Sequence, residues 1–206
     1  MLYREAESVL LISDSQLYNV VPDRLAKAPC HWILLSMRGA GIRHLASLLS
    51  YIDSIYLIRL KQMLCKETEV GLAKISNVVL QLGSNSLFPR QEMVTSGYPN
   101  GIEWAKEMVR LATGLVNRYA HRVFIVASTP RLLVSMDPLA YVLEAYWERL
   151  WDEYSIFLCH HTEANNMISF STHSLTICHL KGPDYIHITQ EAAYEHAQEC
   201  LQLAFH

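Results

Sequence analysis

Two side chains near the C-terminal end of the chain, Asp184 and His187, have the types and spacing of a catalytic base and its partner. An Asp three positions before a His can orient one ring nitrogen, which leaves the other nitrogen to deprotonate a nucleophile. Near the other end of the chain, Asp14 and Ser15 follow the apolar run 9–12, and Ser15 offers the hydroxyl that such a base needs. These residues therefore favour nucleophilic catalysis by a serine.

The elements that must position these side chains follow an alternating pattern of strands and helices. Unbroken runs of branched apolar residues are typical of strands that are covered on both faces, as in a parallel sheet. The five runs are residues 9–13, 31–36, 77–82, 122–127 and 154–159. The alternation predicts an α/β fold, a three-layer α/β/α sandwich around a five-stranded parallel sheet with right-handed crossovers.

Three helices are predicted from apolar residues that recur at spacings of three and four. The first has the apolar stripe Ala105, Met108, Val109, Ala112, Leu115, Val116 and Tyr119. The second follows Pro138 and has the stripe Leu139, Val142, Leu143, Tyr146 and Leu150. In the third, Thr189 is expected to cap a helix whose buried face is Ala193, Ala197, Cys200, Leu201 and Ala204.

The composition indicates one globular domain over residues 1–206. Hydrophobic residues make up 51% of the 206 residues and charged residues 18%, which is typical of a chain that folds around a core. The net charge of -3 gives no indication of nucleic-acid binding. No apolar run is long enough for a transmembrane segment, and residues 1–5 do not resemble the start of a signal peptide. The five cysteines suggest reduced thiols, so we expect an intracellular, cytoplasmic protein.

Further polar or glycine positions follow the predicted strands, where parallel sheets collect their functional residues. Ser15 follows the first strand, and it can be interpreted either as a nucleophile or as a simple helix N-cap. Gly39 and Gly41 follow the second strand and also fit a tight turn with positive φ. Asn85 follows the third strand, and it can be interpreted either as a turn residue or as an amide donor for a developing oxyanion.

Together these motifs resemble the SGNH hydrolases, the GDSL esterase and lipase superfamily, over essentially the full length of the chain. The Gly-Asp-Ser block of that family is similar to residues 13–15, and its second-block glycine to Gly39. Its Gly-x-Asn-Asp block is similar to residues 83–86, and its terminal Asp-x-x-His to Asp184 and His187. The resemblance implies a flavodoxin-like SGNH hydrolase fold.

The resemblance also implies a role for each matching residue. Ser15 would attack an ester carbonyl, with His187 as base and then acid and Asp184 as its orienting partner. The amides of Ser15 and Gly39 and the side chain of Asn85 would form the oxyanion hole. The implied substrate is a small or medium acyl ester, as a small molecule or a lipid, and neither a cofactor nor a metal is expected. The acyl chain, the alcohol and the oligomeric state stay open.

The chain departs from the family pattern at several positions. Ser13 replaces the glycine before the aspartate, and Ser86 replaces the aspartate of the third block. A glycine that commonly follows the Asp-x-x-His is replaced within residues 191–193. None of these changes falls on the residues with implied chemical roles.

Other residue groups allow a second interpretation. The histidines around residues 159–161, 173 and 178–179 suggest zinc, but their spacing fits no compact site, and loop or surface histidines explain them better. The aromatic residues Tyr141, Tyr146, Trp147, Trp151 and Tyr154 suit helix-to-sheet packing or a carbohydrate platform. Arg38, Arg43 and His44 could bind a substrate phosphate or carboxylate, or simply be solvated.

The rival function is an SGNH-fold binding module that recognises a ligand, a protein or a nucleic acid with little or no turnover. Residues 39–45 resemble, more weakly, the esterase-like domain in the first open reading frame of some non-LTR retrotransposons. Such a product would be expected to carry a coiled coil or a basic region, and this sequence has neither. An excised domain would still be compatible with that origin.

Overall fold

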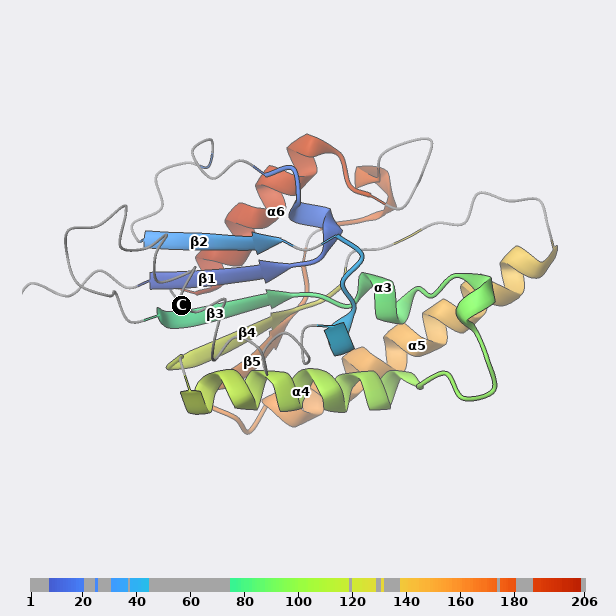
Figure 1. Cartoon of the computed structure of the whole chain (residues 1–206), viewed down its shortest axis with the longest axis horizontal. Helices are drawn as coiled ribbons and strands as arrows, with labels where there is room; N and C mark the ends of the chain where they lie inside the picture. Colours follow the sequence, from blue (N-terminus) through green and yellow to red (C-terminus); the bar gives the residue numbers. More distant parts are fainter. Residues whose placement is uncertain are drawn as a thin grey trace, which may run out of the picture.

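The computed structural model describes residues 8–20, 25, 31–36, 38–44, 75–118, 120–128, 131, 138–173, 175–180 and 187–204. At its centre, five strands form one parallel sheet (Figure 1). The strands are β1 (Ser8–Ser13), β2 (His31–Ser36), β3 (Ile75–Gln81), β4 (Arg122–Val126) and β5 (Ile168–Ser171). The predicted α/β fold with a five-stranded parallel sheet is confirmed.

The strand order is β2-β1-β3-β4-β5, so the direction in which strands are added reverses at β1. From β1 the chain moves outward to β2, then crosses back to β3 on the other side of β1 and continues to β5. In open parallel sheets of this kind, ligands bind at the carboxyl ends of the strands beside the reversal point. The fold therefore directs attention to the segments that follow β1, β2 and β3.

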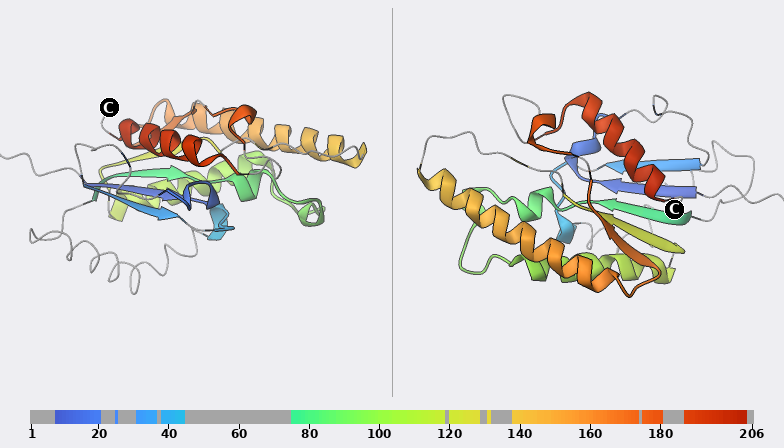
Figure 2. Two further views of the ribbon diagram at one scale, coloured as in Figure 1. Left: turned by 90° about the horizontal axis from the view of Figure 1, so that it is seen from above. Right: turned by 180° about the vertical axis from the view of Figure 1, so that it is seen from behind.

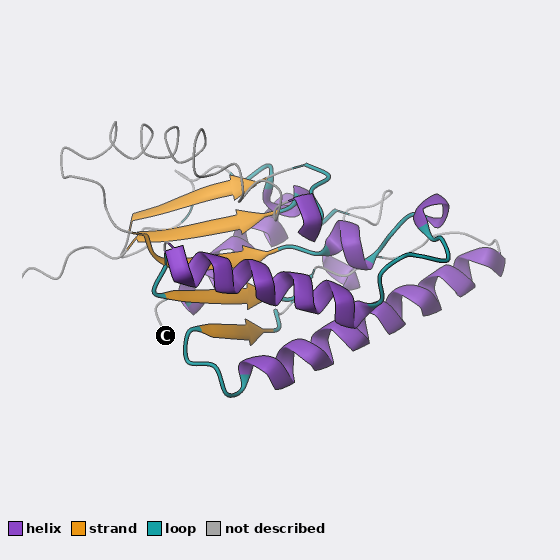
Figure 3. Ribbon diagram, turned by 60° about the horizontal axis from the view of Figure 1, so that its bottom comes forward, coloured by secondary structure: helices purple, strands orange, loops and turns teal. Residues whose placement is uncertain are grey.

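Helices lie on both faces of the sheet (Figures 2 and 3). Helix α4 (Gly101–Arg118) covers one face, and α6 (Gln190–Leu203) covers the other. The long helix α5 (Pro138–Thr162) packs along α4 and beside the edge strand β5. Alternate strand residues serve the two cores: Leu10 and Ile12 face the α4 side, whereas Val9 and Leu11 face the α6 side.

Short helical turns follow three of the strands or lie in the loops after them. They are η1 (Ser15–Leu17), α3 (Ser84–Leu87), η4 (Gln91–Met93) and η5 (Ile177–His179). No helix among the described ranges is both long and apolar enough to span a membrane.

The prediction of a fifth strand at residues 154–159 is wrong, because this segment belongs to α5 and the fifth strand is Ile168–Ser171. Tyr154 and Leu158, four positions apart, are buried, whereas Ile156 is 59% exposed. That pattern is helical, and a short apolar run does not by itself distinguish a buried strand from a buried helix. Histidines 160 and 161 consequently lie at the end of a helix.

The other predicted elements are confirmed, with boundaries that differ by at most two residues for the first four strands. Thr189 caps α6 as predicted, since its side chain accepts a hydrogen bond from the Ala192 amide at 3.3 Å. The second helix begins at Pro138, but Val142 is 68% exposed and so does not belong to its buried face. Tyr119 lies outside the described residues.

Candidate functional site

Asp14 connects the segments that follow β1 and β3 by hydrogen bonds. Its fully buried carboxylate accepts hydrogen bonds from the backbone amides of Gln16 at 3.1 Å and Ser84 at 3.3 Å. Burial raises the pKa of the Asp14 carboxyl, and these amide hydrogen bonds oppose that effect. Asp14 therefore ties the first turn after β1 to the first turn after β3.

Ser15 is the first residue of η1 and is half-buried. The N-cap of this short helix is Asp14, so the interpretation of Ser15 as a plain N-cap is wrong. The backbone before it is held from two sides, because the Ser36 hydroxyl donates to the Asp14 carbonyl at 2.7 Å and the Asp14 amide donates to the Gln81 carbonyl at 3.3 Å. The neighbouring strands β2 and β3 thus position the turn that carries Ser15.

Asn85 lies in α3 with its side-chain amide held at both ends. Its Nδ2 donates to the Ala40 carbonyl at 3.0 Å, and its Oδ1 accepts from Arg131 Nη2 at 3.0 Å. Because a guanidinium can only donate, Arg131 determines which end of the amide is oxygen and which is nitrogen. Nδ2 carries two hydrogens, of which Ala40 takes one. The arrangement fixes the Asn85 amide in the segment that follows β3.

Gly39 and Gly41, which follow β2, are each required for a different reason: a positive φ at Gly39 and a close approach of α3 at Gly41. Gly39 has φ +68° in an exposed turn, the left-handed conformation that glycine adopts without strain. Gly41 lies so close to α3 that a Cβ there would come within 2.8 Å of Ser86 Oγ. That same Oγ accepts a hydrogen bond from the Ile42 amide at 3.0 Å. The positive φ expected of this turn is thus found at Gly39, and Gly41 permits close approach.

His187 is half-buried and directly precedes the N-cap region of α6. The next residue, Ile188, donates its amide hydrogen to Gln16 Oε1 at 3.1 Å. The residue after His187 is therefore bonded to the residue after Ser15, although the two lie near opposite ends of the chain. Asp184, the predicted third member, lies outside the described residues.

Comparison with solved structures identifies the architecture. The chain is similar to a GDSL-like lipase from Bacteroides thetaiotaomicron, with 14% identity, a TM-score of 0.61 and coverage of 96% of this chain and 89% of the other. It is also similar to a carbohydrate acetylesterase family member from Sinorhizobium meliloti, with 16% identity, a TM-score of 0.60 and coverage of 96% of both chains. An aryl esterase from M. smegmatis matches with 16% identity, a TM-score of 0.57 and coverage of 97% of both chains. The chain has the SGNH hydrolase fold. No protein-family model and no curated protein sequence matches it.

Within this SGNH hydrolase fold, Ser13 and Ser86, which replace the glycine and the aspartate of two motif blocks, both form hydrogen bonds to neighbouring segments. Ser13 is fully buried, and its hydroxyl donates to the Gln81 side-chain oxygen on the neighbouring strand. The Ser86 hydroxyl accepts a hydrogen bond from the Ile42 amide in the segment after β2. The Ser86 carbonyl accepts a hydrogen bond from the Tyr98 hydroxyl at 2.7 Å. Both serines therefore connect the segments around the candidate site.

The basic and aromatic residues singled out in the sequence have ordinary packing roles. The guanidinium carbon of Arg38 lies 3.9 Å from the ring centre of Tyr18, and that of Arg43 lies 4.9 Å from the ring centre of Trp104. His44 accepts a hydrogen bond from the Gly41 amide.

On α5, Trp147 and Tyr154 are buried, Tyr146 and Trp151 are partly buried, and Tyr141 is 68% exposed. Packing therefore accounts for most of the aromatic stretch.

A histidine pair that the sequence interpretation missed lies where the segment after β5 meets α6. The rings of His173 and His196 meet edge to face with their centres 5.1 Å apart. His196 is 1% exposed and lies 3.9 Å from the Cys200 sulfur. Its position among Ala193, Ala197 and Cys200 on the predicted apolar face of α6 was the available signal. Burial, with repulsion from His173, lowers the pKa of His196 to about 4.

Within the described part of the chain, no group of three or more His, Cys, Asp or Glu side chains is placed to hold a metal ion. Two hollows in the surface also lie apart from the candidate site. One of about 620 Å³ runs along α5, and one of about 260 Å³ adjoins the histidine pair. Neither is lined by Ser15, Asn85 or His187.

Proposed function

We propose that the chain is a serine esterase that hydrolyses a small or medium acyl ester. Ser15 is the nucleophile, His187 the general base and then acid, and Asp184 the residue that orients the imidazole. The observation that carries the proposal is the hydrogen bond from the Ile188 amide to Gln16 Oε1, which holds the neighbours of His187 and Ser15 together.

The proposed reaction proceeds in two halves. Ser15 Oγ adds to the ester carbonyl carbon while its proton passes to the neutral His187 imidazole. Collapse of the tetrahedral intermediate breaks the bond to the alcohol, which leaves with the proton from the imidazolium. Water then attacks the acyl-enzyme in the same way, and the acid product and free Ser15 are released. No electron transfer or cofactor is needed.

The oxyanion of each tetrahedral intermediate would be stabilised by the amides of Ser15 and Gly39 and by Nδ2 of Asn85. Support comes from the hydrogen bonds of Asn85 to Ala40 and Arg131, which fix the amide before substrate arrives. Donors that are already oriented need no reorganisation as charge develops, and this makes them effective in catalysis. The SGNH hydrolase fold and the esterases that share it agree with this chemistry.

Covalent labelling with a fluorophosphonate probe tests the proposal without knowledge of the substrate. We expect the wild-type protein to be labelled on Ser15 and the Ser15→Ala variant to be unlabelled. Ser96→Ala, which removes an exposed serine from the loop after α3, is the matched control and should be labelled like the wild type.

Two results would overturn the esterase proposal. Labelling that persists in Ser15→Ala would place the reactive hydroxyl elsewhere. A well-folded wild-type protein that reacts with no probe and hydrolyses no p-nitrophenyl ester would favour the binding-module function instead.

A further inference from the structure

The outward side of α5 carries a regular row of exposed side chains. The helix packs inward through Trp147, Leu150, Tyr154 and Leu158. On the opposite side, six exposed residues recur at spacings of three and four. We call them the α5 outer stripe: Val142, Ala145, Arg149, Asp152, Ile156 and Cys159.

The α5 outer stripe has the spacing of a coiled-coil seam. Alternate steps of three and four are the a and d positions of a heptad, at which two helices meet over several turns. The stripe covers about five turns, or ~26 Å of helix. Val142 is 68% exposed and Ile156 59% exposed, which is unusual for large apolar side chains placed in line on one helix.

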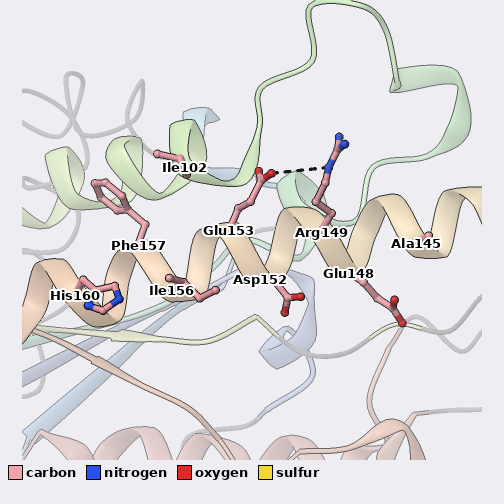
Figure 4. A pocket seen from close by; sticks show the side chains of 9 residues that line it. All are labelled: Ile102, Ala145, Glu148, Arg149, Asp152, Glu153, Ile156, Phe157 and His160. Carbon is pink, nitrogen blue, oxygen red and sulfur yellow. Dashed lines mark ion pairs between the residues drawn. The ribbon is translucent and has the colours of Figure 1, made fainter.

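A hollow beside the α5 outer stripe adds further apolar side chains, from both α5 and α4. Ile156 and Phe157 of α5 and Ile102 of α4 line a hollow of about 620 Å³ (Figure 4). Ile102 is itself 38% exposed. Apolar side chains of α5 and α4 therefore meet around Ile156, beside the charged residues Arg149, Asp152 and Glu153 of α5.

The order of residues along the stripe is self-complementary under a two-fold rotation centred between residues 150 and 151. In an antiparallel pair of α5 helices, Arg149 meets the partner's Asp152, and Asp152 meets the partner's Arg149. In the same register, Ala145 meets the partner's Ile156, and Val142 meets the partner's Cys159. A two-fold interface requires this kind of match of one surface to itself. We propose that the chain forms a homodimer through antiparallel pairing of α5.

The charges on the stripe also select the direction of pairing. In a parallel, in-register pair, Arg149 would face the partner's Arg149, and Asp152 would face the partner's Asp152. Like charges placed opposite each other oppose association, so only the antiparallel arrangement turns both charges into favourable contacts.

Arg149 can make this contact without leaving its present surroundings. Its side chain is 63% exposed, its Nε lies 3.8 Å from Glu153 Oε1, and its guanidinium lies over the Tyr146 ring. These contacts hold the guanidinium at the surface, and a guanidinium has further N–H donors that can reach a second carboxylate. Asp152 is exposed on the next turn of the helix.

Charge reversal tests the pairing by sedimentation at micromolar concentrations. Arg149→Asp would place four carboxylates together at the two-fold axis, and Asp152→Arg would place four guanidiniums there. Each single variant should weaken dimerisation by roughly tenfold or more, since each close unlike pair turns into a like pair. The double variant Arg149→Asp/Asp152→Arg restores the complementary pairs and should recover the dimer. Lys106→Asp, on the exposed side of α4, is the matched control and should leave the dimer unchanged.

Disulfide trapping tests the register. In Val142→Cys, the new thiol should lie beside Cys159 of the partner subunit, so mild oxidation should give a covalent dimer with a 142–159 linkage in mass spectrometry. Val142→Cys/Cys159→Ser should lose that linkage, and Thr113→Cys on α4 should never form one.

The proposal fails if the wild-type protein sediments as a monomer throughout, because the stripe would then be free or reserved for another partner. It also fails if a dimer forms that neither charge reversal weakens, because another surface would then hold it. A 142–142 linkage in the Cys159→Ser background would show parallel pairing and would overturn the antiparallel register. Loss of labelling at Ser15 would leave these results untouched, since they do not depend on esterase activity.

Discussion

The backbone amide of Ile188 and the side-chain oxygen of Gln16 form a buried hydrogen bond of 3.1 Å across a sequence separation of 172 residues. Each partner directly follows a proposed catalytic residue, His187 or Ser15. The bond therefore joins the segment that precedes α6 to the turn after β1, beside the apolar contacts that these segments share. An amide buried at this point needs an acceptor, because its desolvation is otherwise uncompensated.

Replacing the acceptor should affect both stability and catalysis. Gln16→Met keeps the length of the side chain but leaves the Ile188 amide without this partner, which should lower the free energy of unfolding by ~1–3 kcal/mol. In the proposed esterase we also expect a lower kcat, because the segment that carries His187 would be held less firmly against the turn that carries Ser15. Urea unfolding and ester hydrolysis measure the two effects. Gln198→Met, at an exposed position of α6, should change neither, and a Gln16→Met protein with wild-type stability and kcat would contradict the assignment.

Asn85 distinguishes an esterase from a binding module. In the proposed esterase, Asn85→Ala would remove a donor that acts mainly in the transition state, so kcat should fall by ~10²-fold or more while KM changes little. The control Asn117→Ala removes an exposed amide from α4 and should have no effect on either constant. Steady-state kinetics on a p-nitrophenyl ester measure the change, with circular dichroism to check folding. Wild-type kcat in a folded Asn85→Ala protein would remove Asn85 from the oxyanion hole.

The dependence of activity on pH should follow the protonation of His187. Only the neutral imidazole can accept the proton of Ser15, so kcat/KM should fall as the solution becomes acidic. His187→Ala should lower the rate and abolish this acidic limb. If instead the acidic limb survives in His187→Ala, the base is a different residue.

His196 should make the fold less stable in acid. Its pKa lies at about 4 in the folded protein and near 6.5 in an unfolded chain, so the unfolded state binds the proton more readily. Stability is therefore retained above about pH 6.5 and falls between that value and about pH 4, with no further loss from this group below it. The groups facing His196 are His173, Glu199 and Cys200, and the Glu199 carboxylate opposes the shift.

The measurement is the free energy of unfolding in urea at several values between about pH 7 and about pH 4. The loss due to His196 should be on the order of 3 kcal/mol, and His196→Gln should remove most of it. His121→Gln, which changes an exposed histidine, is the control and should retain the full pH dependence. An unchanged slope in His196→Gln would show that other groups cause the acid sensitivity.

Most strands and helices of this fold have patterns that near neighbours in the sequence can predict. The first four strands, α4 and α6 were predicted correctly from patterns of near neighbours, and Thr189 contacts Ala192 just three positions away. The fifth strand was misplaced because residues 154–159 are apolar enough for a strand, whereas Ile168–Ser171 contains two serines. Pairing of Ile168–Ser171 with β4 makes it the edge strand, and that pairing is not encoded within the segment itself.

The same distinction applies to the candidate site. The residue types at the site, and the strand that each of Ser15, Gly39 and Asn85 follows, could be predicted from the sequence, because motif spacing and strand patterns depend on near neighbours. The tertiary structure was needed to show that the Asp14 carboxylate binds the Ser84 amide and that Arg131 and Ala40 orient the Asn85 amide. These bonds join segments that follow different strands. Their partners meet only after the parallel sheet has brought the carboxyl ends of its strands to one edge, which no pattern of neighbouring residues can specify.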